Sequence, residues 1–87
     1  MRFENKVVII TGAAGGIGKE IARKLAGEGA KLTLVDLNEV ILKALSQELN
    51  LSEDRVLLVK ADVSKEEEVK NYVDQTMIKF GRIDGFA

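Results

Sequence analysis

The stretch TGAAGGIG, residues Thr11–Gly18, is the segment from which the fold can be predicted. It follows the apolar run KVVII at residues 6–10, and half of it is glycine. A helix that begins directly after a parallel strand presents unpaired N–H groups and a partial positive charge, which together bind anions. Glycines at this junction allow a phosphate group to approach the backbone. The stretch therefore predicts a phosphate-binding loop between a strand and a helix.

Each position in this loop has an expected role. We expect Gly12 to form the tight turn, Gly16 to admit a pyrophosphate and Gly18 to let the helix pack on the strand. The Thr11 hydroxyl is expected to tie the loop down, and Ile17 to form its apolar floor. The spacing G-x-x-x-G-x-G differs from the G-x-G-x-x-G of most dinucleotide folds and from the Walker loop. The alternative interpretation is a tight turn without a ligand.

Four strand-like segments alternate with three helical segments along the chain. Apolar runs begin at residues 6, 31 and 55, and a shorter one begins at residue 83. The first three lack strict alternation, which is typical of parallel strands covered on both faces. The βαβαβαβ order predicts an α/β fold of the Rossmann type: the first half of a doubly wound parallel sheet, with strand order 3-2-1-4. In this order the first two helices cover one face and the third covers the other.

Apolar residues at helical spacing indicate the buried face of each helix. In the first helix they are Ile17, Ile21 and Leu25, with Gly29 ending the helix. In the second helix, with Asn38 as the expected N-cap, they are Val40, Ile41, Ala44, Leu45 and Leu49. The third helix is expected to begin with a capping box of Ser64 and Glu67 and to end at Gly81. The apolar residues on its buried face are Val69, Tyr72, Val73, Thr76, Met77 and Phe80.

The composition argues against several classes of function. The 87 residues include 13 basic and 14 acidic side chains, for a net charge of −1, so neither nucleic acid nor a membrane surface is expected as a partner. Cysteine and histidine are both absent, which excludes disulfides and removes the commonest metal ligand, and no metal is expected. No apolar run approaches the roughly twenty residues that cross a bilayer. The expected location is the cytoplasm.

Two aspartates close the second and third strands. Asp36 lies where an acidic side chain accepts hydrogen bonds from both hydroxyls of an adenosine ribose and repels a 2′-phosphate. The following Leu37 and Asn38 supply no compensating base, which favours NAD over NADP. Asp62 could accept a hydrogen bond from the adenine amino group, with Val63 against the ring. The alternatives are that Asp36 caps the following helix and that Asp62 is a turn aspartate.

Together these residues resemble the N-terminal, cofactor-binding half of the short-chain dehydrogenase/reductase family. TGAAGGIG resembles the family's TGxxxGxG, LVDLN at residues 34–38 its acid-ended second strand, and ADVS at residues 61–64 its adenine-contacting segment. FGRIDGFA at residues 80–87 resembles the approach to the family's Asn-Asn-Ala-Gly segment. The resemblance implies NAD as cofactor and hydride transfer between the nicotinamide and an alcohol or ketone substrate. The expected cofactor-binding residues are Gly12, Ala14, Gly16, Ile17, Gly18, Asp36, Leu37, Asp62 and Val63.

The catalytic residues of the family would lie beyond Ala87. They are a Ser, a Tyr-x-x-x-Lys pair and an Asn, so no catalytic residue is expected in this chain. The single tyrosine, Tyr72, is followed four residues later by Thr76 and lies on an apolar helix face, so we interpret it as a core residue. We therefore expect residues 1–87 to be the N-terminal half of an NAD-binding Rossmann domain, cut from its catalytic half.

Such a half-domain is expected to be inactive in isolation, to bind NAD weakly and to form homo-oligomers. Two alternatives remain at this point. The chain could be a non-catalytic nucleotide-binding half-fold. It could also be a fragment that self-associates through the strand at residues 83–87.

Overall fold

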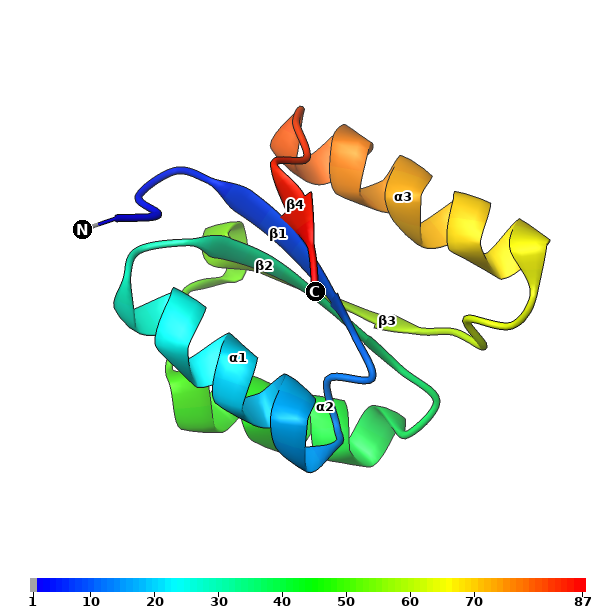
Figure 1. The fold of residues 1–87 in the computed structure, drawn as a ribbon, viewed down its shortest axis with the longest axis horizontal. Coiled ribbons are helices and arrows are strands. Elements are labelled where there is room, and N and C mark those ends of the chain that lie inside the picture. The colour runs from blue at the N-terminus through cyan, green and yellow to red at the C-terminus, as the bar shows by residue number, and fades with distance from the viewer. Residues whose placement is uncertain (1) are drawn as a thin grey trace.

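A parallel sheet with helices on both faces forms the computed structural model, which describes residues 2–87 (Figure 1). The strands lie in the order β3-β2-β1-β4, and all three pairings are parallel. The predicted fold class and strand order are both confirmed. In chain order the elements are β1 (Val7–Thr11), α1 (Gly16–Gly27), β2 (Lys31–Asp36), α2 (Glu39–Leu49), the 3₁₀ turn η1 (Glu53–Arg55), β3 (Val56–Lys60), α3 (Glu66–Phe80) and β4 (Gly85–Phe86).

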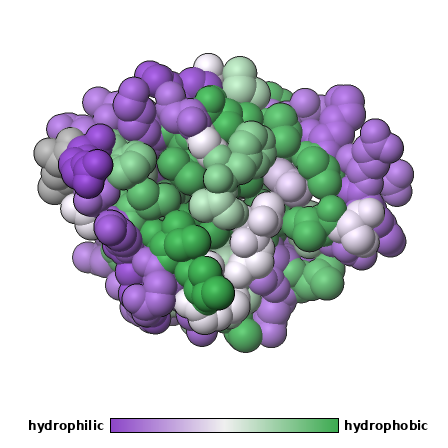
Figure 2. All heavy atoms as spheres, in the orientation of Figure 1, coloured by the Kyte–Doolittle hydropathy of each residue, from purple (hydrophilic) through white to green (hydrophobic). Residues whose placement is uncertain are grey.

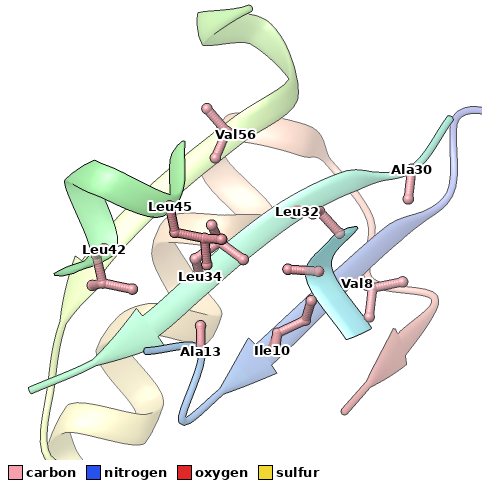
Figure 3. Packing of buried hydrophobic residues seen from close by; sticks show 10 residues of the cluster. Val8, Ile10, Ala13, Ala30, Leu32, Leu34, Leu42, Leu45 and Val56 are labelled. Carbon is pink, nitrogen blue, oxygen red and sulfur yellow. The ribbon is translucent and has the colours of Figure 1, made fainter. Parts of the chain in front are cut away.

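The helices divide between the two faces as predicted. Helices α1 and α2 lie on one face of the sheet, and α3 lies on the other (Figure 1). Successive strand residues point to opposite faces, so the apolar runs supply a core on each side. The core under α1 and α2 includes Val8, Ile10, Leu32, Leu34, Leu42 and Leu45 (Figure 3). The core under α3 consists of Ile9, Val35, Val59, Ala61 and Tyr72, which confirms Tyr72 as a core residue.

The predicted helix faces are partly wrong. Ile17 is 81% exposed, and α1 buries Gly18 and Ala22 instead. Val40 is 78% exposed, and Leu42 takes its place in the core. In α1 the predicted Ile21 and Leu25 do pack against the core, and only Ile17 in the first turn faces outward. In α2 apolar residues occur on several sides, so spacing alone cannot determine which side faces the sheet.

The ends of the helices follow the predictions at three positions and depart from them at one. Asn38 caps α2, because its Oδ1 accepts a hydrogen bond from the N–H of Ile41 at 3.1 Å. Gly29 and Gly81 follow α1 and α3 with φ of +90° and +76°, the left-handed conformation that glycine adopts easily. The predicted capping box does not form, since α3 begins after Lys65 without a side-chain cap.

Asp84 attaches β4 to the sheet. Its Oδ2 accepts a hydrogen bond from the N–H of Val7 at 2.8 Å, and its own N–H donates to the Val7 carbonyl at 2.7 Å. The neighbouring Arg82 guanidinium lies 2.6 Å from Asp84 Oδ1 and lowers the pKa of the Asp84 carboxyl. The Val7 N–H lowers it further, so the acceptor stays ionised well into the acidic range.

Two buried threonines join β2 to α3. The Thr76 hydroxyl donates its proton to the Tyr72 carbonyl at 2.7 Å. In the second bond, at 2.9 Å, the Thr33 hydroxyl must therefore be the donor and Thr76 Oγ1 the acceptor. Both side chains are fully buried. Water therefore cannot replace either partner, and the pair fixes where α3 lies on the sheet.

We expect Thr76→Val to lower the free energy of unfolding by about 1–3 kcal/mol, because it leaves the buried Thr33 hydroxyl without an acceptor. Thr33→Val leaves the Thr76 hydroxyl bonded to Tyr72 and should cost less. The double variant removes both hydroxyls and should be more stable than Thr76→Val alone. Urea unfolding of the three variants tests this order, and strictly additive effects would contradict it.

Candidate functional site

The loop after β1 turns sharply between the sheet and α1. Gly12 has φ +63°, and its carbonyl accepts a hydrogen bond from the N–H of Gly15 at 3.0 Å. The N–H of Ala13 donates to the Val35 carbonyl at 3.1 Å, which holds the loop against the end of β2. The prediction that Gly12 forms the tight turn is confirmed.

Gly18 permits a close contact between α1 and this loop. A Cβ atom at Gly18 would lie 2.3 Å from the Gly12 carbonyl oxygen and 2.8 Å from Ala13 Cα, distances that no side chain can accommodate. The glycine is therefore needed for packing, as predicted, although the contact is with the loop. A Cβ at Gly16 would meet nothing within 4 Å. The space in front of the helix is thus open, while the binding of a pyrophosphate there stays a prediction.

The first turn of α1 suits an anion. Its N-cap is Gly15, which forms no side-chain cap, and the turn contains no acidic residue. No carboxylate of the helix itself therefore neutralises the leading N–H groups or the positive end of the helix dipole. This is the arrangement in which a helix N-terminus binds phosphate.

Asp36 connects the loop to the corner between β2 and α2. Its Oδ2 accepts a hydrogen bond from the N–H of Ala14 at 3.1 Å, and its Oδ1 accepts from the N–H of Asn38 at 3.0 Å. The prediction that Thr11 ties the loop down is wrong, since its hydroxyl donates to the Ala87 carbonyl at 3.4 Å. Asn38 caps α2, so Asp36 is not the direct helix cap. Contact between Asp36 and a ribose stays a prediction.

Asp62 forms a tight turn after β3. Its Oδ1 accepts hydrogen bonds from the N–H and the hydroxyl of Ser64, at 2.9 and 2.6 Å. These bonds, the hydroxyl foremost, lower the pKa of the Asp62 carboxyl, and nearby Lys65 adds to the effect. The turn interpretation is confirmed, and it explains why Ser64 does not cap α3. Both bonds use Oδ1, so Oδ2 can still accept a further donor, as an adenine contact would require.

One residue of this region is not among those predicted from the sequence. Glu68 Oε1 accepts a hydrogen bond from the backbone N–H of Asp62 at 2.7 Å. The only sequence signal is an acidic residue in the first turn of the helix that follows. Such residues are common for dipole reasons alone, so the contact could not be distinguished in advance.

The carboxyl ends of β1, β2 and β3 enclose a cleft of about 140 Å³. It is lined by Gly12, Asp36, Leu37, Ala61, Asp62 and Val63. Parallel strands place their carboxyl ends at one edge of the sheet, and ligands of open α/β sheets bind outside that edge. The remaining predicted residues, Ala14, Gly16, Ile17 and Gly18, lie on the adjoining loop and α1. A larger hollow of about 440 Å³ lies beside β4 and the segment before β1, away from this edge.

The residues around this edge of the sheet have the chemistry that a dinucleotide requires, and the cleft itself has room for only part of one. An uncapped helix end beside open space matches a pyrophosphate, a carboxylate at the end of β2 matches ribose hydroxyls, and exposed Leu37 and Val63 match a flat base. Among residues 2–87 no cluster of three carboxylates is placed to hold a metal ion. In the same part of the chain, no helix has the length and apolar character needed to traverse a bilayer.

Comparison with known proteins identifies relatives over nearly the whole chain. It is 50% identical over 82 residues to the CLA biosynthesis dehydrogenase/reductase of Lactiplantibacillus plantarum, covering 94% of this chain and 29% of that protein. The crystal structure of a short-chain dehydrogenase/reductase (glucose/ribitol dehydrogenase) from Brucella melitensis matches with TM-score 0.92 and 39% identity, over 97% of this chain and 35% of that one. The chain thus spans about a third of the length of the relatives it matches.

Solved relatives include complexes with both nicotinamide dinucleotides. A 3-ketoacyl-(acyl-carrier-protein) reductase from Brucella melitensis complexed with NADH has TM-score 0.85 and 37% identity, over 95% of this chain and 33% of that one. The C-domain of a bacterial malonyl-CoA reductase with NADP has TM-score 0.88 and 35% identity, over 97% of this chain and 14% of that one. The family model for short chain dehydrogenase matches residues 6–87. With this match added to the fold and the cleft, we conclude that the chain belongs to the short-chain dehydrogenase family.

Proposed function

We propose that this chain supplies the dinucleotide-binding part of an NAD-dependent oxidoreductase. The complete protein would transfer hydride between the nicotinamide and an alcohol or ketone. The observation that carries the proposal is the arrangement of Asp36, which lies at the end of β2 and bonds directly to the loop that opens onto the α1 N-terminus. A ribose on Asp36 would therefore lie next to the phosphate that the helix binds.

The preference for NAD over NADP is argued from charge. The Asp36 carboxylate would face the 2′-phosphate of NADP, and Leu37 and Asn38 offer no cation to offset the repulsion. Relatives with either cofactor are known, so family membership leaves this open. The preference rests on these three residues.

We expect NAD to bind at least about tenfold more tightly than NADP, which corresponds to about 1.4 kcal/mol. Isothermal titration of the protein with each dinucleotide measures the ratio. Equal affinities, or tighter binding of NADP, would contradict the preference. If the full-length protein bound neither NAD nor NADP, the proposed function itself would be contradicted.

The isolated 87-residue chain is proposed to be inactive and to bind NAD only weakly. Residues 2–87 contain no exposed tyrosine that could exchange a proton with a substrate, because Tyr72 is 4% exposed and lies in the core. Turnover of an alcohol by the isolated chain would contradict this. The alcohol or ketone substrate, the homo-oligomeric assembly and the cytoplasmic location of the protein are parts of the same proposal.

A second proposal, self-association of the isolated chain, is favoured by the exposed edge of β4. Phe86 on this strand is 61% exposed, and hydrophobic residues gather at the centre of the face that carries β4 (Figure 2). Strands with an open edge can pair with another chain. Sedimentation of the isolated chain as a single monomeric species would contradict this proposal.

A further inference from the structure

The N–H of Asp62 lies just beyond the last hydrogen bond of the sheet. β3 ends at Lys60, and the N–H of the next residue, Ala61, still donates to the Asp36 carbonyl at 3.2 Å. The following N–H, that of Asp62, instead donates to the carboxylate of Glu68 at 2.7 Å. Glu68 thus fixes the peptide from which the side chains of Asp62 and Val63 project.

The Glu68 carboxylate is partly buried and lies near a cation. Lys65 Nζ lies 3.9 Å from Glu68 Oε2, and the N–H of Lys65 donates to the Asp62 carbonyl at 3.1 Å. Only 34% of the Glu68 side chain is exposed. A hydrogen bond to an ionised, partly buried acceptor is stronger than one between neutral groups. The turn at residues 62–65 is therefore closed on one side by Ser64 and on the other by Glu68.

We infer that Glu68 is a positioning residue for the base end of the cleft. It holds Asp62 in the conformation in which the free oxygen of its carboxylate meets the exocyclic amino group of adenine. This inference rests on the proposed function, because it assumes that a nucleotide base occupies the space between Leu37 and Val63. Glu68 acts through Asp62 and does not touch the nucleotide.

The test uses AMP and IMP, which differ at the amino group that Asp62 would recognise. Glu68→Ala removes the acceptor, and Glu68→Asp keeps the charge but shortens the side chain. Glu68→Gln retains an oxygen that can accept from the Asp62 N–H. Glu67→Ala is the matched control, because Glu67 lies in the same turn, is exposed and carries the same charge. All variants are made in the full-length protein, and affinities are measured by titration calorimetry.

The bond is tested first without any nucleotide, by hydrogen exchange at the Asp62 amide. We expect Glu68→Ala and Glu68→Asp to accelerate this exchange by at least about tenfold, because a hydrogen bond to a charged group is lost. Glu68→Gln should retain most of the protection, and Glu67→Ala should match the wild type. Unchanged exchange in both Glu68→Ala and Glu68→Asp would overturn the inference.

Base recognition is then measured as the ratio of the AMP and IMP affinities. The wild type is expected to prefer AMP. Glu68→Ala and Glu68→Asp should bring the ratio of the two affinities close to one, and Glu68→Gln should keep most of the wild-type preference. A wild type that prefers AMP, together with an unchanged ratio in both variants, would overturn the inference and leave the proposed function intact. A wild type that binds AMP and IMP equally would overturn the adenine assignment and this inference together. Glu68→Asp supplies the same comparison if Glu68→Ala does not fold.

Discussion

Replacing Asp36 with alanine is expected to weaken NAD binding by about a hundredfold, which corresponds to about 2.7 kcal/mol. Hydrogen bonds to a charged group contribute about 1.5–3 kcal/mol, and the substitution removes the acceptor proposed for the ribose hydroxyls. It also removes the bond from the N–H of Ala14, which lies in the phosphate-binding loop. The ribose contact and the order of the loop are therefore lost together.

Two further variants separate these effects. Asp36→Asn keeps an oxygen that can accept from the Ala14 N–H and should recover part of the affinity. Glu39→Ala, three residues later, removes the same charge from an exposed site, where Glu39 pairs with Lys43 at 3.6 Å. This variant should change the affinity by less than about twofold. Titration calorimetry of the three variants measures these differences. Wild-type affinity in Asp36→Ala would refute the ribose assignment.

Gly18→Ala is expected to lower the free energy of unfolding by about 2 kcal/mol, within the range for overpacking a tight contact. The added Cβ would lie 2.3 Å from the Gly12 carbonyl oxygen, so either the loop or α1 must move. The atoms that the Cβ would meet belong to the backbone of the loop, which cannot change rotamer as a flexible side chain can. The displaced loop should also bind the dinucleotide more weakly.

Gly27→Ala in the same helix is the matched control for Gly18→Ala. A Cβ at Gly27 meets nothing within 4 Å, and alanine is the better helix former by about 0.5–1 kcal/mol, so this variant should be slightly stabilised. Urea unfolding followed by circular dichroism compares the two. If Gly18→Ala were as stable as Gly27→Ala, the close contact between loop and helix would not be a constraint.

The order and pairing of the strands could be predicted because β1, β2 and β3 are distinct apolar runs. The short β4 begins at Gly85, two residues later than the predicted start at residue 83, because Asp84 there bonds to Val7. Alternation of strands with helices requires a parallel sheet, and few connections are then possible. The rotation of each helix about its axis could not be predicted as well. In VILKAL at residues 40–45, apolar residues occur on several sides, and only packing against the sheet selects Leu42 and Leu45 over Val40.

The residues of the candidate site could be predicted where they lie at the carboxyl ends of strands. Asp36 ends β2 and Asp62 follows the end of β3 by two residues, so both line one cleft. The bonds from Asp36 to the Ala14 N–H and from Glu68 to the Asp62 N–H could not be anticipated. They join a side chain to the backbone of another segment, and such contacts leave no periodic signal in the sequence. The failed capping box has a local cause, because the Ser64 hydroxyl donates to Asp62, two residues earlier in the same turn.

The most direct test is to titrate the ¹⁵N-labelled protein with NAD and map the amide signals that shift. We predict that the largest shifts occur at Gly12–Gly18, at Asp36 and Leu37, and at Asp62 and Val63, which surround the cleft at the carboxyl ends of the strands. Shifts confined to the hollow beside β4, near Phe3 and Phe86, would contradict the assignment of this cleft as the dinucleotide site.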